Sequence, residues 1–140
     1  MSELPVVIVG AGPQGLAAAA HLVERDENVM VIERGEGPAA AVSEWGHVRL
    51  FSAWPELVDA AARRLLETTG WAAPVSGYPT GADWVDGYLA PLANALGERV
   101  HYATTVTGVA RHGRDKVVEG GRRGQSFVCL LYTSPSPRDS

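Results

Sequence analysis

Cysteine is almost absent from this chain. The 140 residues include one cysteine, Cys129, and four histidines. A single thiol cannot form an internal disulfide, a zinc knuckle or a Cys-x-x-Cys redox pair, so a secreted disulfide scaffold and a thiol-relay enzyme are both disfavoured. We therefore expect a cytoplasmic protein. The histidines share no ligand spacing, and we assign none of them to a metal site.

Basic charge and long apolar runs are also scarce. Twelve basic residues stand against 16 acidic ones, and the net charge is -4, whereas nucleic-acid binders usually carry a basic patch. The first apolar run, residues 4–9, has no basic flank and is far too short for a signal peptide or a membrane span. We expect neither nucleic acid nor membrane as a partner.

The first 33 residues predict a strand, a turn, a helix and a second strand. Residues 6–9 form a continuous β-branched run, which is typical of a strand covered on both faces. Alanine and leucine dominate residues 14–25, which predicts a helix. Residues 28–33 form another short apolar run. A helix that joins two strands in this way indicates a parallel pair and an α/β fold.

Three glycines lie at the predicted turn between the first strand and the helix. Gly10, Gly12 and Gly15 form a Gly-x-Gly-x-x-Gly pattern in the context that gives it mechanical meaning. The first allows a tight turn, the second lets the backbone approach a pyrophosphate, and the third lets helix and strand pack closely. The amides at the helix N-terminus and the helix dipole favour the phosphate charge. A glycine turn in an unrelated α/β domain is the alternative.

An acidic residue follows the second strand. Glu33 lies near the usual spacing for a carboxylate that accepts hydrogen bonds from the adenosine ribose hydroxyls. A 2′-phosphate would be repelled there, so Glu33 favours FAD or NAD over NADP at this first site, although the neighbouring Arg34 softens that exclusion.

The opening of the chain resembles that of flavin-dependent oxidoreductases. It is most similar to bacterial enzymes of the flavin-containing monooxygenase type, which carry separate FAD and NADPH domains. The resemblance covers roughly residues 4–128. It rests on residues 7–16 (VIVGAGPQGL) and on 31–34 (VIER), with Pro13 and the small Ala19 typical of the flavoprotein version. Three later stretches, 44–52, 78–80 and 88–93, add to it.

The resemblance implies an FAD site, with NADPH or NADH as the reductant in the full-length enzyme. The glycine turn with Pro13 and Gln14, together with Glu33 and Arg34, would then bind the cofactor, and the backbone at Val106 would hold the adenine. Some disulfide reductases with the same opening carry an early cysteine pair, and residues 1–128 contain no cysteine.

The segment from residue 35 to residue 55 is irregular and rich in aromatic side chains. As a cofactor-lining loop, it would place Trp45 against the cofactor and Arg49 near a flavin phosphate. As a structural loop, it would use the aromatic rings to close the core and leave Arg49 in solvent. Both interpretations remain open at this point.

The remaining elements complete a half-domain. We expect helices over 56–69 and over 82–96, the second kinked by Pro91, and strands over 99–102 and 105–111. Residues 111–123 are basic and contain glycine, which predicts the solvated tip of a hairpin.

The composition changes after residue 128. Residues 129–140 contain a Ser/Pro-rich stretch that resembles translated adapter or vector sequence; a natural disordered tail is the alternative. We therefore expect a partial FAD-binding domain over 1–128 and a non-native or disordered tail over 129–140.

The predicted fold class is α/β, a Rossmann-like FAD/NAD(P)-binding fold with a parallel sheet, truncated at the C-terminus. The leading function is the FAD-binding part of an NAD(P)H-dependent monooxygenase that acts on a small-molecule substrate, with the chain alone inactive. An NAD-dependent dehydrogenase or reductase domain is the first alternative. A non-catalytic nucleotide-binding fragment is the second. The identity of the substrate and the oligomeric state are not encoded in these residues.

Overall fold

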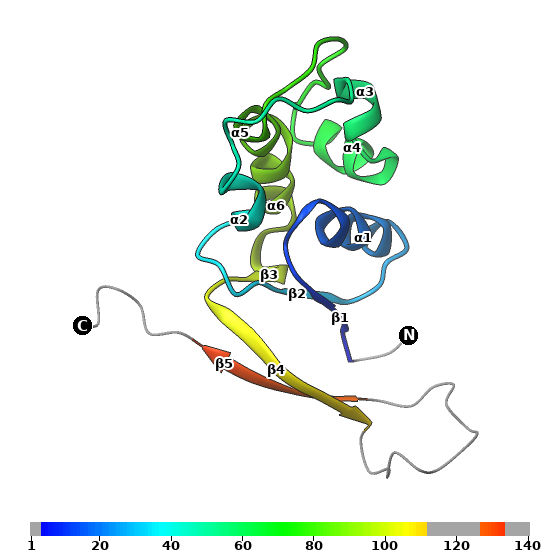
Figure 1. Cartoon of the computed structure of the whole chain (residues 1–140). Coiled ribbons are helices and arrows are strands. Elements are labelled where there is room, and N and C mark those ends of the chain that lie inside the picture. The colour runs from blue at the N-terminus through cyan, green and yellow to red at the C-terminus, as the bar shows by residue number, and fades with distance from the viewer. Residues whose placement is uncertain (1–3, 112–126, 134–140) are drawn as a thin grey trace.

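Three short parallel strands organise the molecule (Figure 1). The structure is a computed structural model and describes residues 4–111 and 127–133. Strands β1 (Val6–Val9), β2 (Val29–Ile32) and β3 (Val100–His101) pair in the order β1-β2-β3, all parallel. The parallel pair predicted from the first 33 residues is confirmed.

Helix α1 (Pro13–Glu24) connects β1 to β2. Its alanine-rich sequence has a high helix propensity, and Pro13 occupies the first turn, where its missing N–H costs no hydrogen bond. Leu16, Ala19 and Ala20 recur at three- and four-residue spacing and are buried. The predicted helix is confirmed to within one residue at each end.

The helix predicted for residues 56–69 is two helices in the structure. Helices α3 (Trp54–Leu57) and α4 (Ala60–Glu67) are separated by two extended residues, of which the second is Asp59. The Asp59 side chain accepts a hydrogen bond from the Ala62 N–H at 3.0 Å and so begins α4. The prediction of one continuous helix was wrong because this N-cap restarts the helix.

The helix predicted for residues 82–96 is present but irregular. It consists of α5 (Gly81–Trp84), a π-helical turn η1 (Val85–Leu89) and α6 (Ala90–Leu96). Thr80 and Asp83 form a capping box at its start.

Proline explains the π-helical turn. Pro91 has no N–H to donate to the carbonyl of Gly87, four residues earlier, and its ring would collide with that carbonyl. The helix therefore widens, and the Gly87 carbonyl accepts a hydrogen bond from the indole Nε1–H of Trp71 at 2.8 Å instead. The structure thus shows an irregular turn before Pro91, while the predicted kink stays a prediction.

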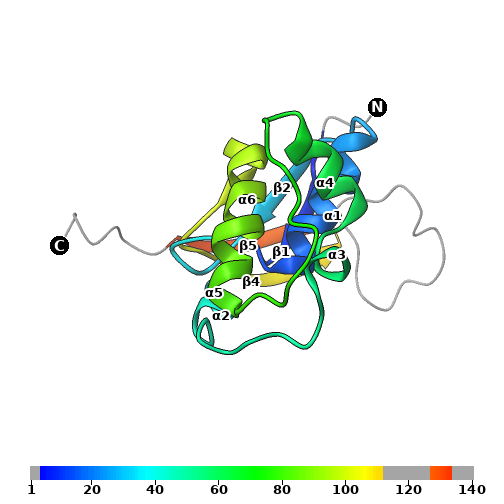
Figure 2. The ribbon, with the colours of Figure 1, turned by 90° about the horizontal axis from the view of Figure 1, so that it is seen from above.

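Helices α1, α4 and α6 pack against one another on one side of the sheet, with α1 next to the strands and α4 on the far side of α1 (Figures 1 and 2). Their inner faces build the core with the strands. None of the helices among the described residues is long and apolar enough to cross a membrane. The largest fully buried side chains are those of Tyr88, Leu16, Leu66, Leu89, Leu92, Leu96 and Val31.

A hairpin follows the parallel sheet. A short 3-10 turn η2 (Gly97–Arg99) leads into β3, and β4 (Thr104–Arg111) then pairs antiparallel with β5 (Phe127–Thr133). In Figure 1 this hairpin lies on the opposite side of the sheet from the helices. The predicted start of a hairpin is confirmed, while its predicted tip falls largely outside the described residues.

Strand β5 crosses the boundary predicted at residue 128. Residues 129–133 are extended and paired with β4, so this part of the predicted tail forms a strand. Residues 134–140 lie outside the described part of the chain. That residues 129–140 are not native to the protein stays a prediction.

The sequence predicts that strand β1 is covered on both faces, but in the structure it is partly exposed. Val6, Val7 and Val9 are 41%, 36% and 63% exposed. The reason is position, because β1 is an edge strand of the described sheet and has a neighbour only in β2. A continuous β-branched run is the composition of a central strand, so this edge is unusually apolar.

Candidate functional site

The three glycines of the turn after β1 each have a distinct structural role. Gly10 has a φ of 103°, which favours glycine and turns the chain sharply away from the strand. A Cβ on Gly15 would overlap the Gly10 carbonyl oxygen and would lie 3.3 Å from Ile8 Cγ2. A Cβ on Gly12 would meet nothing within 4 Å. The outer glycines therefore build the turn, and the middle one borders open space.

The turn leads directly into the N-terminus of α1. Gly12 is the N-cap residue, no side chain caps this helix end, and the Gly12 carbonyl accepts the Leu16 N–H at 3.0 Å. Amides in the first turn of a helix have no partner within the helix, and the dipole makes this end positive. The open space at Gly12 and the uncapped helix end together fit a pyrophosphate group.

Glu33 lies beside this turn at the carboxyl end of β2. One carboxylate oxygen accepts the Ala11 N–H at 2.8 Å, and the other accepts the Gly35 N–H at 2.7 Å. An ionised carboxylate offers about four acceptor positions, so two remain for ribose hydroxyls. The structure thus brings together the predicted acid and the predicted glycine turn.

The carboxyl end of β3 joins the same cluster. The Glu33 N–H donates to the His101 carbonyl at 2.8 Å, and the Glu33 carbonyl accepts the Thr104 N–H at 3.0 Å. Tyr102 lies between His101 and Thr104 in the sequence. Burial is the main cause that raises the pKa of its phenol, and the charge of Glu33 raises it further. The ends of all three strands therefore meet at Glu33.

The other predicted residues of this region lie as follows. Gln14 and Arg34 are exposed, Pro13 is half-buried, and Val106 is half-buried in β4 opposite Leu131. Nothing in the structure places Val106 against the glycine turn, and its contact with adenine remains a prediction.

Trp45 and Arg49 face structural partners in this structure. Trp45 is half-buried against the core, and a Cβ on Gly81 would lie 2.9 Å from its ring. Arg49 is exposed, and its Nη1 donates to the Tyr78 carbonyl at 2.6 Å. These contacts tie the loop after α2 (Ala40–Ser43) to the first residue of α5 and to the segment before it, as the structural interpretation expects. A contact with a cofactor is untested for both residues.

Two residues of the turn region were missed by sequence reasoning. Gly35 carries one of the two amides that bind Glu33, and Ala39 has a φ of 52° while its N–H donates to the Ala11 carbonyl at 2.9 Å. Gly35 could have been noticed as a glycine two residues after the acid. Ala39 gave no signal, because alanine rarely adopts a positive φ.

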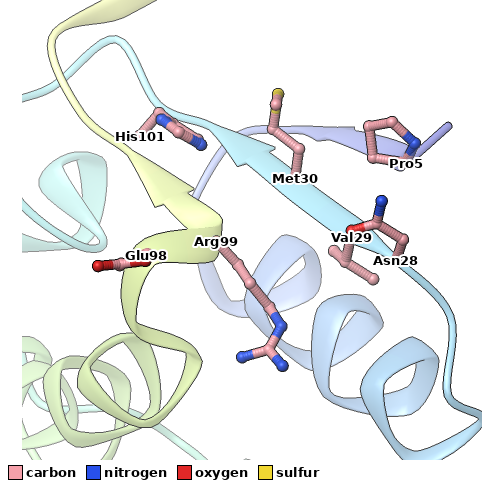
Figure 3. A pocket seen from close by; sticks show the side chains of 7 residues that line it. All are labelled: Pro5, Asn28, Val29, Met30, Glu98, Arg99 and His101. Atoms are coloured by element: carbon pink, nitrogen blue, oxygen red, sulfur yellow. The ribbon is translucent and has the colours of Figure 1, made fainter. Parts of the chain in front are cut away.

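A shallow hollow of about 360 Å³ lies along the strands, away from the glycine turn (Figure 3). Most of its lining lies at the amino ends of β1 and β2 and in the turn before β3, and His101, the last residue of β3, completes it. It contains none of the predicted site residues. The lining residues are Pro5, Asn28, Val29, Met30, Glu98, Arg99 and His101. Within the described ranges, no three His, Cys, Asp or Glu side chains cluster as metal ligands would.

Comparison with known proteins agrees with this geometry. Residues 8–70 match the model of the NAD(P)-binding Rossmann-like domain, and these residues contain the glycine turn, Glu33 and Arg49. The molecule has a Rossmann-like NAD(P)-binding fold. Comparison with curated protein sequences gave no significant match.

Solved structures with the same fold include several oxidoreductases. OTEMO with FAD bound superposes with a TM-score of 0.67 at 17% identity, over 95% of this chain and 23% of that one. Bacillithiol disulfide reductase Bdr (YpdA) from Bacillus cereus gives 0.60 at 24% identity, over 91% and 36%. A flavin monooxygenase from Stenotrophomonas maltophilia gives 0.56 at 23% identity, over 81% and 32%. The chain thus spans between about a quarter and about a third of the length of these neighbours.

Proposed function

We propose that this chain is the FAD-binding part of a flavin-dependent oxidoreductase of the NAD(P)H-dependent monooxygenase type. The observation that carries the proposal is the joint placement of the glycine turn and Glu33. An open cradle at Gly12, the N-terminus of α1 and a carboxylate meet at the carboxyl ends of three parallel strands. Ligands of open α/β sheets bind at this end.

The residues divide between the parts of the cofactor. The amides of the first turn of α1 would hold the pyrophosphate, and Glu33 would accept hydrogen bonds from the adenosine ribose. Val106, Trp45 and Arg49 would lie along the remaining length of the cofactor. A flavin held by these residues would supply the chemistry of hydride transfer from NADPH or NADH and of electron transfer to dioxygen or to another acceptor.

The choice of FAD has separate support. Structures with this fold include OTEMO with FAD bound and OTEMO with both FAD and NADP. Glu33 disfavours a 2′-phosphate, so NADP fits this first site poorly and would bind elsewhere in a full-length enzyme. A small-molecule substrate and a cytoplasmic location belong to the same proposal. We expect the chain alone to bind the cofactor without turnover.

The competing function is an NAD-dependent dehydrogenase or reductase domain. The matching domain is described as NAD(P)-binding, and the same turn and acid would serve NAD. A non-catalytic nucleotide-binding fragment is the other alternative, and it would bind a nucleotide without redox activity.

Calorimetric titration of the chain with FAD, NAD⁺ and NADP⁺ tests the proposal. We expect FAD to bind most tightly and NADP⁺ most weakly. The variant Gly12→Val should abolish binding, because its side chain would occupy the open space at the turn. Binding of NAD⁺ without FAD would favour the dehydrogenase, and unchanged FAD affinity in Gly12→Val would exclude the glycine turn as the site.

A further inference from the structure

Both backbone groups of Ala11 are held by the segment that follows β2. The Ala11 N–H donates to the Glu33 carboxylate at 2.8 Å, and the Ala11 carbonyl accepts the Ala39 N–H at 2.9 Å. Ala11 is also fully buried. The direction of the glycine turn is therefore fixed by the segment 33–39 as well as by its own glycines.

The carboxylate that holds Ala11 is itself fixed. Its second oxygen accepts the Gly35 N–H at 2.7 Å, and the backbone of Glu33 is bonded to the chain that leaves β3. A Cβ on Gly35 would lie 2.9 Å from this carboxylate and 2.6 Å from the Ala40 Cβ. A side chain at position 35 would therefore displace either the carboxylate or the start of α2.

From this geometry we propose that Glu33 is a positioning residue for the pyrophosphate. Its carboxylate holds the glycine turn in the free protein, so that the amides of the first turn of α1 already face outward when the ligand arrives. The inference rests on the proposed function. It goes further because it gives Glu33 a role toward the phosphates, in addition to the one expected toward the ribose.

A positioning role and a purely electrostatic role of Glu33 predict opposite changes in pyrophosphate affinity when the charge is removed. A carboxylate near a pyrophosphate repels it, so removing the charge should by itself strengthen binding of the anion. If Glu33 holds the turn, removing the charge should weaken binding even of an anion that has no ribose. Inorganic pyrophosphate is therefore the decisive probe, with ADP as the ribose-containing comparison.

The first experiment measures pyrophosphate and ADP affinity of the full chain and of Glu33→Gln. Glutamine keeps the size of the side chain but can accept only one of the two amide hydrogen bonds. We expect pyrophosphate affinity to fall about tenfold, a factor that corresponds to about 1.4 kcal/mol. The matched control is Glu36→Gln, which removes an exposed acid from the same segment and should not weaken binding. Equal or tighter pyrophosphate binding in Glu33→Gln would overturn the inference.

A second pair of variants leaves Glu33 in place. Gly35→Ala should displace the carboxylate and weaken pyrophosphate binding, whereas Gly37→Ala has open space for its Cβ and should not. Hydrogen exchange of the Ala11 amide in the unliganded protein gives an independent measurement. We expect faster exchange in Glu33→Gln and Gly35→Ala than in the wild type and Gly37→Ala, with all four folded by circular dichroism.

The two measurements separate the two proposals. If the wild type binds neither pyrophosphate nor ADP, the proposed function is overturned, and exchange at Ala11 still decides whether Glu33 holds the turn. If the wild type binds both ligands and exchange at Ala11 is unchanged in Glu33→Gln, the proposed function stands and the positioning role is overturned.

Discussion

Substitutions at Gly12 and Gly15, two glycines of one turn, should affect FAD binding and protein stability differently. A Cβ at position 12 meets open space, while a Cβ at position 15 overlaps the Gly10 carbonyl oxygen. We expect Gly12→Ala to lower FAD affinity and to cost less than about 1 kcal/mol of stability. Gly15→Ala should cost about 1–3 kcal/mol, because α1 must move away from β1. Urea unfolding and FAD titration of both variants check this pair, and similar stability losses in the two would contradict it.

A second residue-scale prediction concerns acid stability. Burial raises the pKa of Asp59, but the Ala62 N–H and the His21 imidazole, 2.9 Å away, outweigh it, so the pKa lies below its ordinary value of 3.8. A pKa lowered by folding means that the carboxylate stabilises the native state above its unfolded pKa. That contribution is lost as pH falls through the folded value.

The variant Asp59→Asn isolates this charge, because asparagine caps a helix about as well as aspartate. We expect it to cost below about 1 kcal/mol at neutral pH. Between about pH 6 and pH 3 it should lose less stability than the wild type does. Thermal unfolding across this range measures the difference, and parallel losses in the two proteins would show that Asp59 does not contribute.

At the scale of elements, the π-helical turn predicts that the effects of substitutions at Trp71 and Pro91 depend on each other. The Gly87 carbonyl depends on the Trp71 indole because Pro91 cannot donate to it. Trp71→Phe should therefore cost about 1–3 kcal/mol, since a part-buried carbonyl loses its partner. In a Pro91→Ala background, the N–H of residue 91 can donate to the Gly87 carbonyl. Trp71→Phe should therefore cost clearly less stability there than in the wild type.

A double-mutant cycle by chemical denaturation measures this coupling. Equal costs of Trp71→Phe in both backgrounds would mean that Pro91 does not free the Gly87 carbonyl. The comparison needs no bound cofactor, so it tests the fold independently of the function.

The sequence predicted most of the elements that build the site. Strand β1, the turn, α1, β2 and Glu33 follow from local patterns: a β-branched run, three spaced glycines, an alanine-rich helix and an acid after a strand. The break at Asp59 was missed, because one capping residue inside an apolar pattern competes with a continuous helix. The contacts of Glu33 with Ala11 and Gly35 were also missed, since backbone amides leave no mark in the sequence.

At the scale of the whole molecule, the described part of the chain exposes apolar side chains on two of its strands. Val9 on β1 is 63% exposed, and Phe127 and Leu130 on β5 are each 60% exposed. The exposure of β1 could not be predicted from its composition, because a continuous β-branched run is typical of a central strand, whereas β1 is an edge strand of the described sheet. The neighbours with the same fold are about three to four times as long as the part that this chain matches.

The most direct test of the central claim is the visible absorption spectrum of the purified chain after FAD is added and the excess is removed by gel filtration. The account predicts a retained flavin spectrum, which Gly12→Val should lack. A chain that is folded by circular dichroism but retains no flavin would contradict the FAD assignment, and NAD⁺ binding by the same sample would transfer the site to the dehydrogenase alternative.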